Sequence, residues 1–143
     1  METIHKSFEE LSSVQLQDIF RLRQNVFIIE QQCFYEDIDG ADAKAEHLLI
    51  YDEEKLAAYL RIFPYGVKYE NEANMGRIVV DPEFRGTGLG ERLIKKGIEL
   101  CDKKPIRIEA QAALEKYYNG FGFKAEGEVY VVDDIDHLQM VLA

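Results

Sequence analysis

The sequence contains only two cysteines, Cys33 and Cys101, among its 143 residues. Two cysteines cannot build a disulfide framework, and without a CxxC spacing a structural zinc site is not expected. No apolar run approaches the roughly 20 residues of a membrane span. Residues Met1–Lys6 also lack the apolar core of a signal peptide. We therefore expect a cytoplasmic protein that uses no metal.

Positive charge is also scarce, since 17 Lys and Arg face 27 Asp and Glu and the formal net charge is −10. This balance argues against nucleic-acid binding, which needs a basic face, and against adsorption to anionic membranes. Hydrophobic residues make up 47% of the chain, which is too many for a disordered coil. The length is typical of one domain, so we expect a single domain over residues 1–143.

Hydrophobic periodicity predicts short strands and a few helices. Ser12 and Gln15 form a capping-box pattern at the start of the first helix. The expected order is strand 3–8, helix 13–30, loop 31–46, strands 47–51, 55–63 and 76–80, helix 91–103, strand 106–110, helix 112–119, and strands 129–132 and 137–142. The strand–helix–strand unit over 76–110 predicts a right-handed parallel crossover, and the flanking hairpins predict antiparallel pairs. The fold class is therefore α+β with one mixed sheet.

A glycine-rich turn over residues 85–90 joins a strand to a helix. Gly86, Gly88 and Gly90 let successive backbone N–H groups face one point without interference from Cβ atoms. The N-terminus of the following helix adds partial positive charge. Together these features predict an anion cradle that suits a pyrophosphate.

Three known phosphate-binding motifs can be compared with this turn. A Walker A loop needs a lysine next to its last glycine, and none occurs here before Lys95. A dinucleotide fingerprint needs G-x-G-x-x-G, whereas this turn has G-x-G-x-G. The acetyl-CoA loop, Arg/Gln-x-x-Gly-x-Gly/Ala, is matched fully by Arg85, Gly88 and Gly90.

The order of motifs resembles the GNAT N-acyltransferase superfamily, because Tyr118 stands four residues before Gly122-Phe123 beyond the crossover. Further features resemble its ElaA-like subfamily. They are Leu22-Arg23, Val26 to Cys33, Tyr35, Asp37-x-Asp39-Gly40, Ala110-Gln111-Ala112 and His137-x-x-Met140. The resemblance covers about residues 4–143. It implies the GNAT acyl-CoA N-acyltransferase fold, a mixed central sheet with splayed fourth and fifth strands flanked by helices.

The resemblance also implies an acetyl-CoA site. The fourth strand would bind the pantetheine arm through its backbone, and the turn would bind the pyrophosphate mostly through main-chain N–H groups. The residues concerned are Ile78, Val79 and Val80 on the strand and Arg85, Gly86, Thr87, Gly88, Leu89 and Gly90 on the turn. A backbone N–H near Val79 would stabilise negative charge on the acyl oxygen.

Tyr118 aligns with the family tyrosine that protonates the departing thiolate. The attacking amine must lose a proton, yet residues 75–80 contain no acid of the kind many GNAT enzymes use there. Glu109, His137 and Glu30 are the candidates for the missing base. We favour His137 as a catalytic residue and Glu30, with Gln31, as residues of the acceptor site.

The charge is distributed unevenly along the chain. Residues 30–54 hold nine acids and one base, whereas residues 85–107 hold seven bases and three acids. The basic region is expected to bind an anionic cofactor, and the acidic region is expected to form a rim that attracts a cationic amine.

The sequence therefore predicts an N-acetyltransferase in which a primary amine of a small molecule or peptide attacks acetyl-CoA directly in a ternary complex. The alternative is a catalytically weak CoA-binding sensor or interaction module on the same fold, favoured by the missing acid on the fourth strand. The protein is expected to be a monomer or a homodimer, and the identity of the amine stays open.

Overall fold

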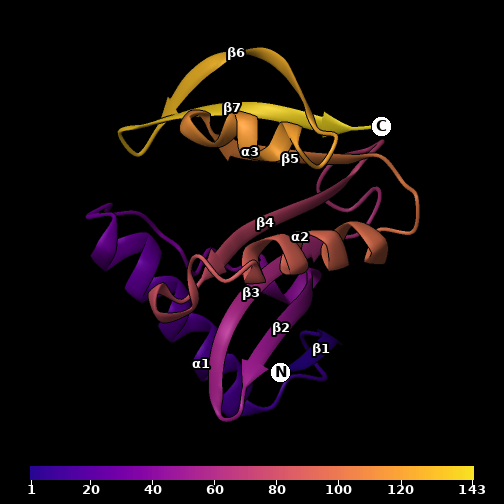
Figure 1. Ribbon diagram of the computed structural model, residues 1–143. Coiled ribbons are helices and arrows are strands. Elements are labelled where there is room, and N and C mark those ends of the chain that lie inside the picture. The colour runs from indigo at the N-terminus through magenta and orange to yellow at the C-terminus, as the bar shows by residue number, and fades with distance from the viewer.

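A computed structural model describes all 143 residues and has one seven-stranded mixed sheet in the order β1-β2-β3-β4-β5-β7-β6 (Figure 1). The strands are β1 Glu2–Ser7, β2 Glu46–Asp52, β3 Lys55–Phe63, β4 Ala73–Val80, β5 Ile106–Gln111, β6 Lys124–Val132 and β7 Ile135–Leu142. Only β4 and β5 pair in parallel, as the crossover predicts. The expected α+β class and mixed sheet are confirmed.

Helical segments cover both faces of the sheet. The α-helices are α1 Ser13–Arg23, α2 Leu89–Leu100 and α3 Glu115–Asn119, and a π-helical turn, η1 Gln24–Glu30, extends α1. Short 3-10 turns are η2 Asp42–Lys44, η3 Pro82–Phe84 and η4 Ala112–Leu114. No helix is both long and apolar enough to cross a membrane.

The predicted capping box at the start of α1 is confirmed. The Ser12 hydroxyl accepts from Gln15 N–H at 3.0 Å, and the Gln15 side chain accepts from Ser12 N–H at 2.9 Å. Two bonds thus satisfy backbone donors that a helix start otherwise leaves free.

Several element boundaries differ from the sequence prediction. β4 begins at Ala73 rather than at residue 76, because Ala73 pairs with Ile106 of β5 and donates its N–H to Pro105 O at 2.8 Å. β6 begins at Lys124 rather than at residue 129, because Lys124 pairs with Val141 of β7. In both cases pairing with a neighbouring strand extends the element beyond the residues whose own pattern predicts a strand.

The core has two parts, one on each face of the sheet. A cluster of 19 buried residues lies on the face covered by α2 and α3, and a cluster of eight lies on the face covered by α1. Successive residues of β3 show the alternation: Leu60 belongs to the first cluster and Tyr59 to the second.

A bulge in β4 shifts this alternation at Arg77. Tyr59 pairs with Val79 and Arg61 pairs with Gly76, so two residues of β4 oppose one residue of β3. Arg77 has φ +50°, in the left-handed region that side chains rarely adopt. The bulge thus places a long cationic side chain at the middle of the sheet.

The bulge has a visible effect on packing. Met75 belongs to the core beneath α2, and after the bulge Ile78 and Val80 pack against that same core. The spacing from Met75 to Ile78 is three residues, whereas a regular strand repeats its faces every two. Gly76 and Arg77 therefore both lie on the α1 face.

β4 and β5 separate soon after they meet, as Figure 1 shows. They pair only at Ala73–Ile106 and Asn74–Arg107. At that point the Asn74 amide donates to Arg107 O at 3.0 Å. Beyond it the two strands diverge, which confirms the expected splay of the fourth and fifth strands.

Helix α2 lies very close to the sheet at Gly97. A Cβ atom built there would lie 2.8 Å from Met75 Sδ and 3.0 Å from Leu60 Cδ2. We expect Gly97→Val to lower the free energy of unfolding by about 1–3 kcal/mol through overpacking. Glu99→Val on the exposed side of α2 is the matched control, measured by urea denaturation. Equal losses in the two variants would contradict this close packing.

Candidate active site

The splay between β4 and β5 opens into a cleft of about 400 Å³. One wall comes from β4, from Asn74 to Val80, and the other from β5, from Ile108 to Gln111. Segments distant in sequence complete it: Val26, Phe27, Gln31, Cys33, Tyr35, Arg61, Lys68, Arg85, Leu114, Tyr118, Val132, Asp133, Ile135 and His137.

The cleft has an apolar side and a polar side, because side chains alternate between the two faces of each strand. Residues on the α2 and α3 face belong to the larger core or pack against it, namely Ile78, Val80, Ile108, Ala110 and Tyr118. Residues on the α1 face include charged and hydrogen-bonding groups, namely Arg61, Arg77, Glu109, Gln111 and His137, beside the apolar Val26, Phe27 and Val79. Two chemically different molecules can therefore approach one point from opposite faces.

Tyr118 lines the cleft from the apolar side and is 6% exposed. Its ring contacts Phe123 and Tyr117 edge to face, at centroid distances of 6.1 and 5.4 Å. Burial raises the pKa of the Tyr118 hydroxyl, so the group remains protonated and able to donate. Tyr117 does not line the cleft and is 43% exposed.

His137 lines the cleft from the polar side, on β7 opposite Gln111. Its Nδ1 lies 2.8 Å from Ile135 O. A carbonyl only accepts hydrogen bonds, so Nδ1 donates to it, and Nε2 has no hydrogen-bond partner in the structure. The ring stacks on Tyr130 at 6.1 Å, which fixes its orientation.

The glycine-rich turn is open toward solvent. Gly86 and Gly88 have φ of +77° and +84°, and a Cβ built on either would meet nothing within 4 Å. Gly88 precedes α2, no side chain caps that helix, and Arg92 N–H donates to Gly88 O at 3.1 Å. The backbone N–H groups of the first turn of α2 therefore have no capping side chain and can donate to an anion.

The predicted basic region beside this turn is partly paired within the protein. Gly88 borders a second, shallower groove that Arg92, Lys95 and Lys96 also line. Lys95 pairs with Glu91 at 2.7 Å and Lys96 with Glu99 at 3.3 Å. Surface pairs of this kind exchange readily with other anions.

The backbone of β4 offers alternate N–H groups to the cleft. Asp81 N–H donates to Ala57 O of β3 at 2.8 Å. Successive N–H groups along a strand point to opposite neighbours, so every second one points the same way. Val79 lies two residues before Asp81, and its N–H therefore also points toward β3. Ile78 and Val80 therefore direct their N–H groups toward the side where β5 has diverged.

Glu30 does not line the cleft and instead binds Arg85. The Arg85 guanidinium donates to both Glu30 carboxylate oxygens at 2.7 Å. This hydrogen bonding lowers the pKa of Glu30, which makes it a weaker base. Gln31, the other predicted acceptor-site residue, does line the cleft, and Gln111 Nε2 approaches Gln31 Oε1 at 3.5 Å.

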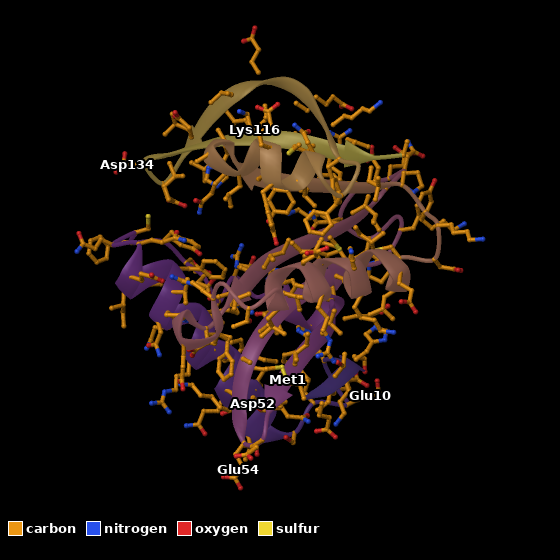
Figure 2. All side chains as sticks on the ribbon, viewed as in Figure 1. Met1, Glu10, Asp52, Glu54, Lys116 and Asp134 are labelled. Carbon is orange, nitrogen blue, oxygen red and sulfur yellow. The ribbon has the colours of Figure 1, made fainter.

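The acids of residues 30–54 do not form the predicted acidic rim. Asp37, Asp39 and Asp42 face arginines of the protein interior. Asp52 and Glu54 lie at the β2–β3 turn, at the end of the molecule opposite Asp134 (Figure 2). The expectation of an electronegative acceptor entrance is wrong for two reasons. Arginines neutralise part of the negative charge, and the acids of the β2–β3 turn lie far from the entrance.

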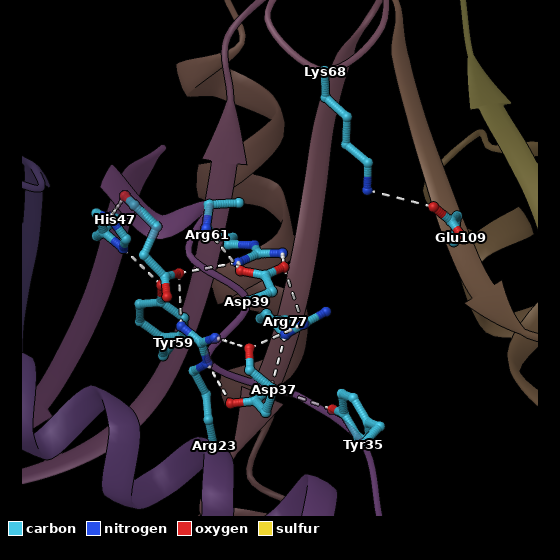
Figure 3. A network of polar contacts seen from close by, with 12 residues as sticks. Arg23, Tyr35, Asp37, Asp39, His47, Tyr59, Arg61, Lys68, Arg77 and Glu109 are labelled. Atoms are coloured by element: carbon cyan, nitrogen blue, oxygen red, sulfur yellow. Dashed lines mark hydrogen bonds and ion pairs between the residues drawn. The ribbon is translucent and has the colours of Figure 1, made fainter. Parts of the chain in front are cut away.

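A network of three arginines and three aspartates lies beneath the polar side of the cleft (Figure 3). Arg23 of α1 contacts Asp37 at 3.0 Å and Asp42 at 2.8 Å. Arg61 of β3 contacts Asp42 at 3.0 Å and Asp39 at 2.9 Å. These bonds attach the loop that follows η1 to the helix and to the sheet.

Arg77 completes this network from the bulge of β4. Its Nε lies 2.8 Å from Asp37 Oδ1, and its Nη2 donates to Asp37 O at 3.1 Å. Arg61 also lowers the pKa of Asp39 well below its usual range. Arg23, Asp37 and Asp39 are among the sequence features that resemble the ElaA-like subfamily. The sequence did not predict that the two aspartates pair with arginines.

His47 lies at the edge of this network and is fully buried. Its Nε2 is 2.9 Å from Asp42 O and its Nδ1 is 2.7 Å from the Tyr59 hydroxyl. Burial lowers the pKa of His47, so the ring is neutral. It donates from Nε2 and accepts at Nδ1, and it has a structural role. No cluster of His, Cys, Asp or Glu side chains in the structure could hold a metal ion.

A mixed sheet with a splayed parallel pair and an uncapped glycine turn before α2 defines the GNAT class of acyltransferases. The model of the acetyltransferase (GNAT) domain matches residues 10–143, and the chain belongs to this family. Within it the chain is ElaA-like. It is 38% identical to protein ElaA of Escherichia coli over 145 residues, covering 97% of this chain and 93% of that protein.

Solved structures agree with this assignment. The crystal structure of Escherichia coli ElaA matches with a TM-score of 0.92 and 36% identity, over the whole of both chains. An acyl-CoA N-acyltransferase from Pseudomonas aeruginosa matches with a TM-score of 0.94 and 34% identity, also over the whole of both chains. An aminoglycoside 6′-N-acetyltransferase solved with coenzyme A shares the fold alone, with a TM-score of 0.69 and 14% identity over 96% of this chain and 95% of that chain.

Proposed function

We propose that this GNAT acyltransferase transfers the acetyl group of acetyl-CoA to a primary amine of a small molecule or peptide in a ternary complex. The observation that carries the proposal is the arrangement of the cleft. Tyr118 lies on its apolar side and His137 on its polar side, so a proton donor and a proton acceptor face one space.

The residues present fit a CoA thioester. The open turn at Gly86 and Gly88 and the free amides of the first turn of α2 would bind the pyrophosphate. The backbone of Ile78 and Val80, which faces the diverged strand, would bind the pantetheine arm. Arg85 lines the cleft beside this path, and it can exchange Glu30 for a phosphate because both side chains are 44% exposed.

Acetyl-CoA supplies the acyl group as a thioester. His137 Nε2 accepts the proton that the amine loses as its nitrogen bonds to the acyl carbon. The Ile78 N–H stabilises the negative charge on the acyl oxygen. When the carbon–sulfur bond breaks, the Tyr118 hydroxyl donates its proton to the sulfur, whose thiol has a pKa near 8.5 in the free form.

The cofactor assignment is tested by Gly88→Val. A β-branched side chain at φ +84° is strained and covers the open cradle, so we expect acetyl-CoA affinity to fall at least about tenfold. The measurement is isothermal titration calorimetry. In the unmodified protein, acetyl-CoA at about 100 times its dissociation constant should add about 2.7 kcal/mol of stability.

Gly127→Val is the matched control for this experiment. Gly127 has φ +85° and open space around it, but it lies on β6 and lines neither the cleft nor the groove beside the turn. Both variants carry the same backbone strain, and only Gly88→Val should lose acetyl-CoA binding. Equal affinities in the two variants would contradict the cofactor site.

A further inference from the structure

Charged side chains of both signs line the polar side of the cleft. The charged residues that line it are four bases, Arg61, Lys68, Arg77 and Arg85, and two acids, Glu109 and Asp133. Arg61 is occupied by Asp39 and Asp42, and Arg85 is occupied by Glu30. Lys68 and Arg77 are also paired, with Glu109 and with Asp37 and Asp39, but each keeps nitrogen donors that make no hydrogen bond or ion pair.

The guanidinium of Arg77 is paired through two of its three nitrogens. Its Nε and Nη2 contact Asp37 and Asp39. No hydrogen bond or ion pair involves Nη1, although the guanidinium carbon lies 5.6 Å from the centroid of the Tyr35 ring. Figure 3 shows the terminal nitrogen that has no dashed line pointing away from both aspartates toward the β5 side. The two aspartates orient the guanidinium, so its free N–H groups are already directed before a ligand arrives.

Lys68 approaches the same cleft from the connection between β3 and β4. Its ammonium has three donors. One of them reaches Glu109 Oε1 at 3.4 Å, and the ammonium also lies over the rings of Phe63 and Tyr69, at 5.8 and 5.5 Å from their centroids. Glu109 also accepts from the hydroxyls of Tyr69 at 3.1 Å and Tyr130 at 3.2 Å. Glu109 is thus well satisfied by other partners, and Lys68 can turn toward an anionic ligand.

We propose that the acceptor is a small primary amine that also carries a carboxylate, and that Arg77 Nη1 and Lys68 Nζ bind this carboxylate. The inference rests on the proposed function. A planar guanidinium and an ammonium are suitable partners for a carboxylate. The amino group of such a ligand lies toward His137, which lines the same polar side. An amine with a second cationic group would meet repulsion from these two bases.

The test is a comparison of matched acceptors. Each standard amino acid with a primary α-amine is assayed against its own carboxamide with acetyl-CoA, and thiol release is measured. We expect the preferred acids to have kcat/KM at least about tenfold higher than their carboxamides. Lys68→Gln should raise KM for those acids about tenfold and leave the carboxamides unchanged, which removes the preference. Lys124→Gln, an exposed lysine of β6 outside the cleft, is the control and should change neither value.

Failure of this inference can be told apart from failure of the proposed function. If acids and carboxamides react equally, in the wild type and in Lys68→Gln alike, the carboxylate site is wrong and the acetyltransferase stands. If no amine reacts, the proposed function is wrong, and calorimetry on the CoA-saturated protein decides the carboxylate site. Binding of acids that exceeds binding of carboxamides, and that is lost in Lys68→Gln, supports the site; equal binding overturns it.

Discussion

Replacing Tyr118 with phenylalanine is expected to lower kcat by about 100-fold or more, because the variant lacks the proton donor for the departing thiolate. Tyr118 lines the cleft, and it belongs to the core cluster beneath α2 and α3. Phenylalanine keeps that packing, so the melting temperature and the affinity for acetyl-CoA should change little. The measurement is kcat for an amine found in a broad screen, together with calorimetric titration of acetyl-CoA.

Tyr117→Phe is the matched control. Tyr117 is adjacent in sequence but lies outside the cleft, so its loss should leave kcat within about twofold of the wild type, since no reacting group is removed. A wild-type kcat in Tyr118→Phe would show that another group protonates the sulfur. A protein that binds acetyl-CoA yet acetylates no amine would instead be the CoA-binding module that the missing acid on β4 favours.

Replacing Asp42 with asparagine is expected to lower the free energy of unfolding by about 3–5 kcal/mol. Asp42 is buried and its Oδ1 accepts from both Arg23 and Arg61. Asparagine has nearly the same shape but no charge, so it leaves an unbalanced positive charge in the interior. Chemical denaturation monitored by circular dichroism measures the loss.

Asp136→Asn controls for removal of a carboxylate from the surface. Asp136 is exposed and has no ion pair, so its replacement should change stability by no more than about 0.5 kcal/mol. A double-mutant cycle between Asp42→Asn and Arg61→Met isolates the interaction between the two groups. Equal losses for Asp42→Asn and Asp136→Asn would show that the network does not stabilise the fold.

The elements of the fold were largely predictable because their signals are local. The capping box at Ser12, the apolar face of α2 and the crossover to β5 each depend on residues close in sequence. The bulge at Arg77 was not predictable from hydrophobic pattern. Ile78, Val79 and Val80 are all apolar, so the run looks the same whichever face each residue occupies.

Sequence motifs predict some residues of the candidate site, but they do not predict the ion pairs between residues distant in sequence. The glycine turn, Tyr118 and His137 follow from motifs, and all three border the cleft or the groove beside the turn. Glu30 pairs with Arg85, which lies 55 residues away, so its sequence neighbours do not reveal this contact. A sum of charge over residues 30–54 likewise cannot reveal that the balancing arginines come from α1, β3 and β4.

The proposed acetyltransferase activity is tested most directly by measuring thiol release from acetyl-CoA. The purified wild-type protein is assayed with a broad panel of primary amines. Mass spectrometry of each mixture identifies any acetylated product. We expect amine-dependent thiol release, with a product heavier by one acetyl group and with release abolished when the amine is omitted. Thiol release from no amine in the panel, at acetyl-CoA concentrations that saturate the protein by calorimetry, would contradict the proposed activity.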